Sequence, residues 1–137
     1  MTRALGLDPG TKRIGVAVSD SSRTMAFPRS SIEASASAVQ VVVDLVRDES
    51  ISTVVVGRPL TLAGEVSAST TKAEEFSREL ERALPDVELI RWDERLTTVS
   101  AQKSMTSAGK SAREQRGAID SAAAAVLLQH FLESNHA

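Results

Sequence analysis

The spacing of apolar and polar side chains predicts that the chain opens with a β-hairpin. Two apolar runs with β-branched residues, Arg3–Leu7 and Ile14–Val18, lie on either side of Asp8–Lys12, a segment with the composition of a turn. A third short strand is predicted near Thr24–Phe27, ended by Pro28. Together these segments predict an antiparallel meander.

Beyond the meander, helical spacing alternates with continuous apolar runs. Valines at helical spacing predict an amphipathic helix over Ser35–Asp48, capped by a serine at its start, and an apolar stripe predicts a second helix over Ser67–Leu84. The run Ile51–Val56 is apolar throughout, which fits a strand buried on both faces. Val87–Trp92 is predicted to be another strand.

The last third of the chain is predicted to be largely helical. We expect a helix from about Thr97 toward Met105, a flexible loop of small, polar and basic residues over Ser104–Gly117, and a final helix from Arg113 to about Leu132. The order of elements predicts an α/β fold in which helices flank a mixed sheet. No repeat or linker divides the sequence, so residues 1–137 are expected to form one domain.

The composition is that of an ordinary soluble domain, with 42% apolar and 25% charged residues. The absence of cysteine excludes disulfides, zinc–thiolate sites and cysteine nucleophiles. Only 3% of the residues are aromatic, which argues against stacking on bases as the main mode of binding. No signal peptide or membrane-spanning stretch is found, so we expect a cytoplasmic protein without membrane contacts.

The charges are unevenly distributed along the chain. The net charge of −2 gives no basic signature for nucleic-acid binding, yet residues 1–30 and 91–117 each carry +3 while residues 31–90 carry −6. If folding brings the two basic segments together, they form a patch that can bind phosphate. The alternative is a set of solvated loops whose charge has no partner.

Asp8 is the first candidate functional residue, because it ends an apolar strand just before a turn. Strand ends are where α/β proteins commonly bind ligands, so a carboxylate at this point is a candidate ligand or catalytic group. The alternative is an aspartate that only shapes the turn with Pro9 and Gly10.

Asp93 and Glu94 follow the predicted strand Val87–Trp92 in the same way. Neighbouring residues on a strand point to opposite faces, so at most one of this pair can point to the same place as Asp8. Their alternative role is to favour the N-terminus of the helix that is expected to follow.

Asp120 lies early in the final helix, on a stripe with Ala123, Ala124 and Leu127. An unpaired acid on a buried stripe is costly, and a bound cation removes that cost. The alternative is an N-cap or an exposed acid in the first turn.

These acids, from two strand ends and a helix, can converge on one point. Hard divalent cations such as Mg²⁺ or Mn²⁺ prefer a cluster of oxygen ligands. Two such ions about 3.5–4 Å apart activate water and stabilise the leaving oxygen in phosphodiester hydrolysis. Neither the two histidines nor any serine offers comparable chemistry. The pattern therefore predicts a metal-dependent hydrolase of phosphodiester bonds.

Four motifs, in order along nearly the whole chain, resemble the YqgF/RuvX family. They are Gly6–Asp20, Val55–Leu60 with Gly64, Asp93–Thr98 and Ile119–Ala123. The resemblance implies an RNase H-like fold, with a five-stranded mixed sheet and flanking helices, and a metal-dependent nuclease. Two substrates are attached to the family. The main expectation is 5′-end processing of precursor 16S ribosomal RNA, and the alternative is cleavage of Holliday junctions.

The motif positions imply catalytic and metal-binding roles for Asp8, Glu94 and Asp120, with Asp93 as a further metal ligand. Contacts to nucleic acid are expected from the basic residues of the two positive segments and from one arginine between them: Lys12, Arg13, Arg58, Arg95, Lys103, Lys110, Arg113 and Arg116.

The chain departs from related resolvases, which carry another acid after the strand equivalent to Ile51–Val56 and two acids in the last helix. Here Asp120 stands alone in its helix motif, so three ligands rather than four are expected. A monomer would favour rRNA processing, and a two-fold homodimer would favour junction cleavage.

Two other readings remain. One is a non-catalytic protein that binds structured nucleic acid, against which the retention of all three acids argues. The other is an actin-like ATPase, whose phosphate-binding turn resembles Asp8–Thr11 but which needs two domains, whereas 137 residues supply one.

Overall fold

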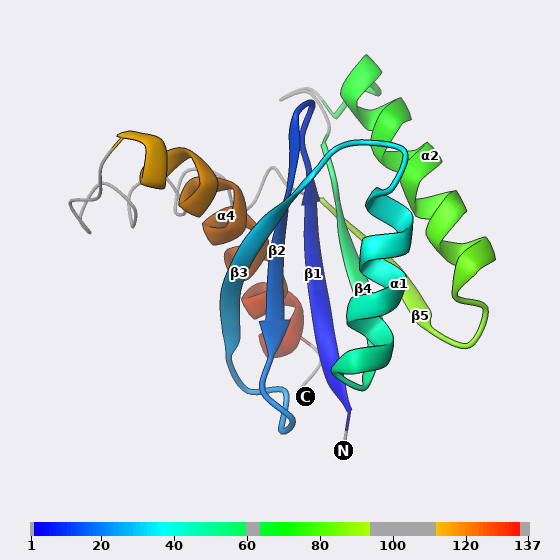
Figure 1. The fold of residues 1–137 in the computed structure, drawn as a ribbon, viewed down its shortest axis with the longest axis vertical. Coiled ribbons are helices and arrows are strands. Elements are labelled where there is room, and N and C mark those ends of the chain that lie inside the picture. Colours follow the sequence, from blue (N-terminus) through cyan, green and yellow to red (C-terminus); the bar gives the residue numbers. More distant parts are fainter. Residues whose placement is uncertain (1, 60–63, 94–111, 135–137) are drawn as a thin grey trace.

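The computed structural model describes residues 2–59, 64–93 and 112–134, and in the last of these segments it describes side chains from Ser121 onward. The segments form a single mixed sheet with helices on both faces, as Figure 1 shows. The elements are β1 (Arg3–Pro9), β2 (Arg13–Ser19), β3 (Ala26–Glu33), α1 (Ala38–Asp48), β4 (Ile51–Arg58), α2 (Ala68–Ala83), β5 (Glu88–Asp93) and α4 (Ala112–Ser134).

The five strands lie in the order β3-β2-β1-β4-β5. The first three form the predicted antiparallel meander, while β4 pairs with β1 and β5 pairs with β4 in parallel. Because β1, β4 and β5 run in the same direction, their carboxyl ends meet at one edge of the sheet, at the top of Figure 1. The β1–β2 turn lies at the same edge.

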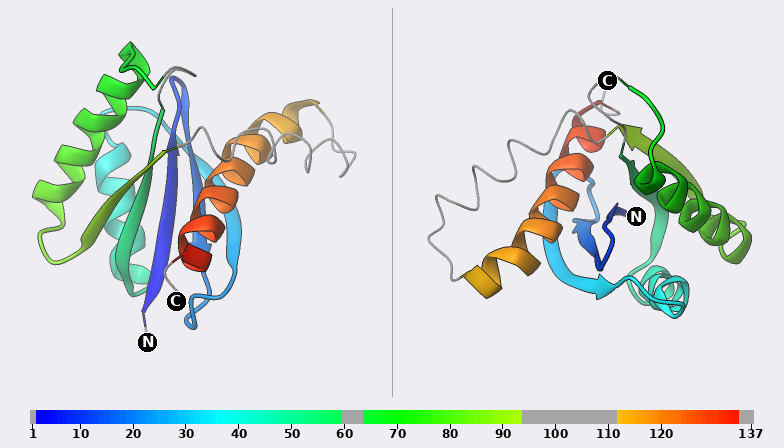
Figure 2. Two further views of the ribbon diagram at one scale, coloured as in Figure 1. Left: turned by 180° about the vertical axis from the view of Figure 1, so that it is seen from behind. Right: turned by 90° about the horizontal axis from the view of Figure 1, so that it is seen from above.

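The helices are divided between the two faces of the sheet. Both views in Figure 2 place α1 and α2 on one face and α4 on the other. The α1/α2 face is packed with large aliphatic residues, among them Leu5, Leu7 and Val56, which are almost fully buried. The α4 face is packed with smaller residues of the sheet, Ala4 and Ala17, against leucines of the helix.

The α/β fold with a five-stranded mixed sheet is confirmed, and most of the predicted boundaries lie within a few residues of the observed ones. The third strand is wrong in extent, because β3 passes through Pro28 and continues to Glu33. This strand is at the edge of the sheet, where a missing N–H can face away from the ladder.

The final helix begins earlier than the predicted loop allows. Residues 112–117 belong to α4 and not to a loop, so the prediction of a loop as far as Gly117 is wrong for these residues. The helix predicted from Thr97 toward Met105 lies outside the described residues. No described helix is long and apolar enough to cross a membrane.

Candidate active site

Asp8 lies near the carboxyl end of the central strand β1 and is half-buried. Its partner across the antiparallel ladder is Gly15 of β2, which has no side chain to cover it. Along β1, Ala4 packs in the cluster beneath α4, whereas the leucines on either side of Gly6 pack toward α1 and α2. Strand alternation therefore places Asp8 on the α4 face.

A close approach at Gly6 sets the position of α4 over β1. A Cβ added at Gly6 would lie 2.8 Å from the Cβ of Leu128 and 3.0 Å from the carbonyl oxygen of Ala124. The helix can rest at this depth only because the strand has no side chain there. The first sequence motif thus contains both Asp8 and, two residues earlier, the glycine that admits α4.

Ser121 anchors α4 near the same edge of the sheet. Its hydroxyl donates to the carbonyl oxygen of Arg29 in β3 and accepts a hydrogen bond from the backbone N–H of Val16 in β2 at 3.5 Å. The β2–β3 register shifts between Ile14 and Val16, and this buried hydroxyl supplies a partner to the irregular ladder. One side chain thereby fixes the helix to two strands.

The contacts of α4 place residue 120 at the level of Asp8. The helix runs opposite to β1, because its later residues pack with Ala4 while Ala124 lies over Gly6. From Gly6 to Asp8 the strand advances about 6.8 Å, and from Ala124 back to Asp120 the helix advances about 6 Å. The backbone of Asp120, next to Ser121, is therefore beside the carboxyl end of β1.

Asp93 lies at the carboxyl end of β5 but on the other face of the sheet. Arg91, two residues earlier, forms ion pairs with Glu74 at 2.8 Å and Glu81 at 2.9 Å, both on α2. Trp92, which lies between Arg91 and Asp93 in the sequence, packs edge-on against Phe131 of α4, with ring centroids 6.1 Å apart. Alternation thus assigns Asp93 to the α2 face, away from Asp8. Glu94 lies outside the described residues.

The acidic residues that the sequence singles out all supply carboxylate oxygens, the ligand type that Mg²⁺ and Mn²⁺ prefer. Asp8 and the backbone at position 120 share a face and a level of the sheet. Among the residues whose side chains the structure describes, no three acidic or histidine side chains gather closely enough to hold a metal.

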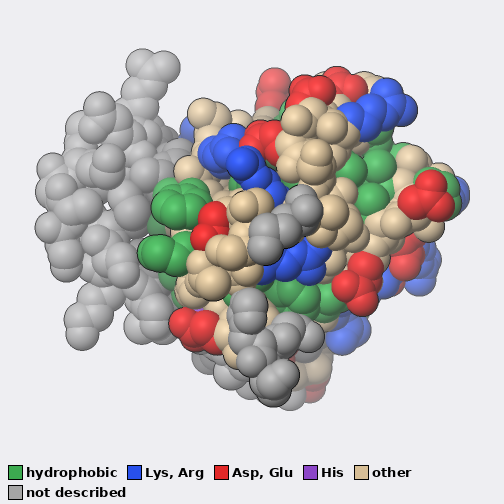
Figure 3. Space-filling model, turned by 90° about the horizontal axis from the view of Figure 1, so that it is seen from below, with side chains coloured by type: hydrophobic (Ala, Val, Ile, Leu, Met, Phe, Trp, Pro, Cys, Tyr) green, Lys and Arg blue, Asp and Glu red, His purple; other side chains and the backbone are tan. Residues whose placement is uncertain are grey.

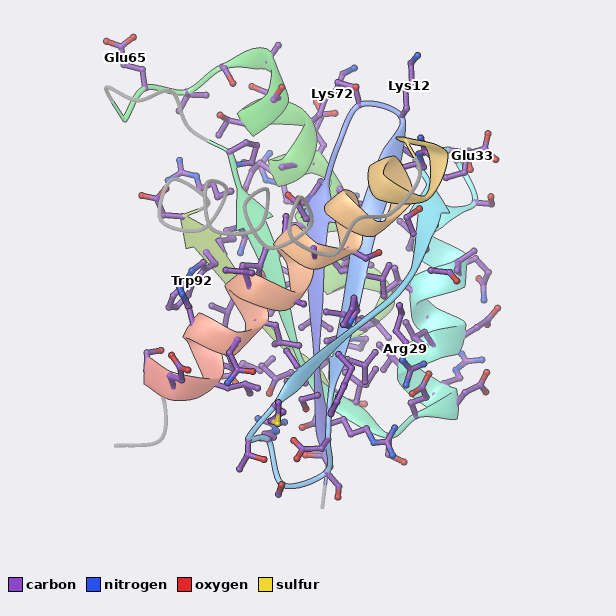
Figure 4. All side chains as sticks on the ribbon, turned by 90° about the vertical axis from the view of Figure 1, so that its left-hand side faces the viewer. Lys12, Arg29, Glu33, Glu65, Lys72 and Trp92 are labelled. Carbon is purple, nitrogen blue, oxygen red and sulfur yellow. The ribbon has the colours of Figure 1, made fainter. Side chains whose placement is uncertain are left out.

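Two of the predicted phosphate contacts lie at the β1–β2 turn. Lys12 and Arg13 are exposed there, beyond Asp8. Gly10 closes the turn, since its N–H donates to the carbonyl oxygen of Arg13 at 2.9 Å and an added Cβ would lie 2.6 Å from that oxygen. Figure 4 shows Lys12 at the tip of this hairpin, pointing away from the sheet.

The other predicted contacts are spread over the molecule. Arg58 is exposed at the end of β4, where it lines a hollow with residues of α2 and so lies across the sheet from Asp8. Arg113 and Arg116 lie in the first turns of α4. The remaining three lie outside the described residues: Arg95, Lys103 and Lys110.

Two groups away from Asp8 have pKa values that their hydrogen bonds shift strongly. Hydrogen bonds from the Thr24 hydroxyl and the Met25 backbone hold the pKa of Asp20, in the β2–β3 turn, far below its usual range. Hydrogen bonds to Glu81 and Glu74 raise the pKa of Arg91, which stays a cation. Both are structural ties, one at a turn and one between α2 and β5.

The end of the sheet opposite Asp8 is held by ion pairs. Glu49 accepts from Arg29 at 2.7 Å and from Arg3 at 3.2 Å. Figure 3, which looks onto this end, shows acidic and basic side chains intermingled over its described surface. Mixed charge of this kind forms no single-sign field that would attract a polyanion.

Sequence reasoning did not single out Gly6, Ser121 or Lys72, although the first two belong to quoted motifs. A glycine inside a predicted strand and a serine beside Asp120 were available as signals of a close backbone approach. Their role depends on which helix crosses which strand, and local patterns do not give that information.

The mixed five-stranded sheet, with helices on both faces, is an RNase H-like fold. Two solved structures share the fold: the RuvC of T. thermophilus in complex with a Holliday junction substrate has a TM-score of 0.59 at 14% identity, with 98% of this chain and 95% of that chain covered. A second structure of Thermus thermophilus RuvC has a TM-score of 0.57 at 15% identity, with 97% and 95% covered.

The chain belongs to the RuvX family. The family model described as "RuvX: Holliday junction resolvase" matches residues 2–134. A "Putative pre-16S rRNA nuclease" of Corynebacterium jeikeium is 42% identical, with 96% of this chain and 86% of that protein covered. A protein of the same name from Roseiflexus sp. is 40% identical, with 96% and 94% covered.

Proposed function

We propose that this protein is a divalent-metal-dependent endonuclease that processes the 5′ end of precursor 16S ribosomal RNA. The observation that carries the proposal is that Asp8 and the segment of α4 around Ser121 lie on one face of the sheet, an arrangement that the close contact at Gly6 allows. The names of the relatives that match nearly the whole chain support this substrate. The action takes place in the cytoplasm, where precursor rRNA is found.

Asp8, Asp120 and Glu94 hold the cation in this proposal. Asp93 is the weaker candidate, because alternation assigns it to the α2 face. Glu94 takes the third position because the motif Asp93–Thr98 implies this role for it. A cation held there supplies the positive charge that makes water a nucleophile near neutral pH and stabilises charge on the leaving oxygen.

The residues around the acids orient the substrate. Lys12 and Arg13 hold phosphates next to the reacting bond, because the β1–β2 turn projects at the same edge as Asp8. Arg113 and Arg116, in the first turns of α4, extend this contact, together with Lys103 and Lys110. Ser121 keeps the helix at the depth at which Asp120 reaches the cation.

The test is cleavage of a labelled precursor 16S rRNA fragment in Mg²⁺ or Mn²⁺ by the wild type, Asp8→Asn and Asp44→Asn. The last variant makes the same chemical change at an exposed position of α1. Loss of several kcal/mol of transition-state stabilisation lowers the rate about a thousandfold in Asp8→Asn. Cleavage that survives Asp8→Asn, or is absent from the wild type, would contradict the proposal.

A second candidate is cleavage of four-way DNA junctions. The description of the matching family model favours it. Paired cuts require two active sites on one side of a two-fold dimer, so a monomer in sedimentation argues for the rRNA reading. A junction cleaved faster than the rRNA fragment under the same conditions would replace the first candidate. Binding of both without cleavage would leave a non-catalytic binding protein.

A further inference from the structure

A second concave site lies at the same edge of the sheet as Asp8, on the α1/α2 face. It is a pocket of about 210 Å³ between the β1–β2 turn, the start of α1 and the first turns of α2. Its walls come from β1, β2, α1 and α2, together with the β1–β2 turn and the connection before α1. The lining residues are Pro9, Gly10, Thr11, Ile14, Ala34, Ser35, Ala38, Ser69, Lys72, Ala73 and Phe76.

The pocket has an apolar floor and a polar mouth. Ile14, Ala38 and Ala73 are almost fully buried, and the ring of Phe76 is half-buried beside them. Exposed hydroxyl groups, from a threonine and two serines, surround the opening. An apolar floor with a few polar groups at the rim is the usual form of a site for a small organic group.

Lys72 is the one ionisable side chain among the residues that line this pocket. The acidic neighbours of Lys72 on α2, Glu74 and Glu75, line a separate hollow with Arg58 and Arg78. Figure 4 shows Lys72 and Lys12 pointing out of the molecule at the same end of the sheet. The mouth of the pocket therefore has a positive charge that suits a phosphate.

The size of the pocket limits its occupant. Sites that enclose whole drug-sized ligands measure about 300–1,000 Å³, so this pocket holds a smaller group. One base fits that description, with its sugar and phosphate left at the mouth. Pro9, which follows Asp8 in the chain, is part of the wall, so the pocket opens at the same end of the sheet as the proposed metal site but on the opposite face.

We propose that this pocket binds the base of an unpaired nucleotide of the substrate strand, beside the phosphate that is cleaved, and that Lys72 binds the phosphate of that nucleotide. The proposal rests on the proposed nuclease function and adds a substrate feature to it. A base inside a duplex must first be unpaired and unstacked before it can enter the pocket, and an unpaired nucleotide avoids that cost. The protein therefore cleaves next to a single-stranded nucleotide.

The binding test uses a fluorescein-labelled single-stranded RNA hexamer and fluorescence anisotropy, without divalent metal. Ser69→Phe fills the mouth from an exposed position, and Lys72→Gln removes the charge. Arg82→Gln is the matched control, because it makes a similar change of charge on an exposed face near the other end of α2. A base packed on an aromatic ring contributes enough that Ser69→Phe weakens binding about tenfold.

The same measurement can overturn the proposal. Equal affinity of the wild type, Ser69→Phe and Lys72→Gln would remove the pocket from the binding surface. Tight binding of adenosine monophosphate, with no gain from the longer hexamer, would assign the pocket to a free nucleotide instead. Neither result depends on cleavage, so a failed nuclease proposal and a failed pocket proposal are distinguishable.

A cleavage test then locates the nucleotide. Single abasic positions are introduced in turn on each side of the bond that the wild type cleaves. We expect one abasic position to raise KM about tenfold in the wild type and to have no further effect in Ser69→Phe, whose pocket is already closed. An abasic effect of the same size in both proteins would contradict the assignment.

Discussion

The two faces of the sheet are built from the same strands but differ in the size of their side chains. On the α1/α2 face, Leu5, Leu7 and Val56 fill the space beneath the helices. On the α4 face the corresponding residues of β1 are Ala4 and Gly6, and a Cβ at Gly6 would overlap the helix. Side chains of the strands fill the α1/α2 face, whereas side chains of the helix fill the α4 face.

This difference explains how α4 comes close to β1 at the level of Asp8. Small residues let α4 approach β1 closely, and Ser121 then ties its backbone to β2 and β3. Residue 120 thereby reaches the level of Asp8. Large aliphatic residues would keep a helix too far away for a shared cation. The α1/α2 face, in contrast, contributes stability and the pocket at its edge.

Leu5→Ala is expected to have the largest effect on stability. The side chain is completely buried on the α1/α2 face, and its truncation costs about 2–5 kcal/mol in the free energy of unfolding. Turnover of the molecules that remain folded should not change. Urea denaturation measures the free energy of unfolding, and cleavage rates at low temperature measure turnover. A loss of turnover in a protein that is still folded would contradict the contrast between the two faces of the sheet.

Gly6→Ala should lower turnover more than it lowers stability. The added methyl group overlaps Leu128, and relief of such overpacking costs about 1–3 kcal/mol. Because the helix moves away from β1, turnover falls more than in Leu5→Ala even though less stability is lost. Leu128→Ala keeps the Cβ atom that the methyl group meets and leaves the Ala124 carbonyl oxygen in place, so adding it should not restore the turnover. Full activity of Gly6→Ala would contradict the role given to the close contact.

The N-terminal caps of α1 and α2 predict a smaller difference in stability between two serine variants. Ser67 caps α2, accepting the N–H of Thr70 at 3.3 Å in a reciprocal capping box, whereas Ser37 precedes α1 without a side-chain capping bond. Ser67→Ala should lower the free energy of unfolding by about 1 kcal/mol. Ser37→Ala should lower it less, as thermal melts of the two variants can show. Equal losses would contradict this assignment.

Asp20 predicts a small pH-dependent effect at the far end of the sheet. Its pKa is lowered in the folded protein, chiefly by the Thr24 hydroxyl. The carboxylate therefore stabilises the fold above its ordinary value of 3.8, and this contribution disappears as the pH falls below that value. Wild type and Asp20→Asn should differ in stability at pH 7 and converge in acid. A difference of the same size at pH 5 and at pH 2 would contradict the assignment.

Local patterns were sufficient for most of the fold. Ile51–Val56, apolar throughout, is the buried strand β4, and the stripe over Ser67–Leu84 is α2. Pro28 misled because its effect depends on the position of the strand in the sheet, and β3 is at the edge. Strand order and edge position arise from long-range pairing, which a local pattern does not contain.

The candidate site was only partly predictable. The alternation of side chains along a strand predicts that Asp93 and Glu94 point to opposite sides of the sheet. It does not predict which of the two side chains points toward Asp8. The ion pairs of Arg91 with α2 supply that answer for Asp93. The roles of Gly6 and Lys72 depend on α4 and on the α1–α2 pocket, so they required the folded chain. The other site assignments stay predictions.

The most direct test of the α4-face site is Mn²⁺ binding, followed by the electron paramagnetic resonance of the free ion. Asp8→Asn and Asp93→Asn remove one carboxylate each from the ends of two strands on opposite faces. A lost ligand should weaken binding at least about tenfold in Asp8→Asn, while Asp93→Asn stays close to the wild type. Weak binding by Asp93→Asn together with wild-type affinity in Asp8→Asn would contradict the account.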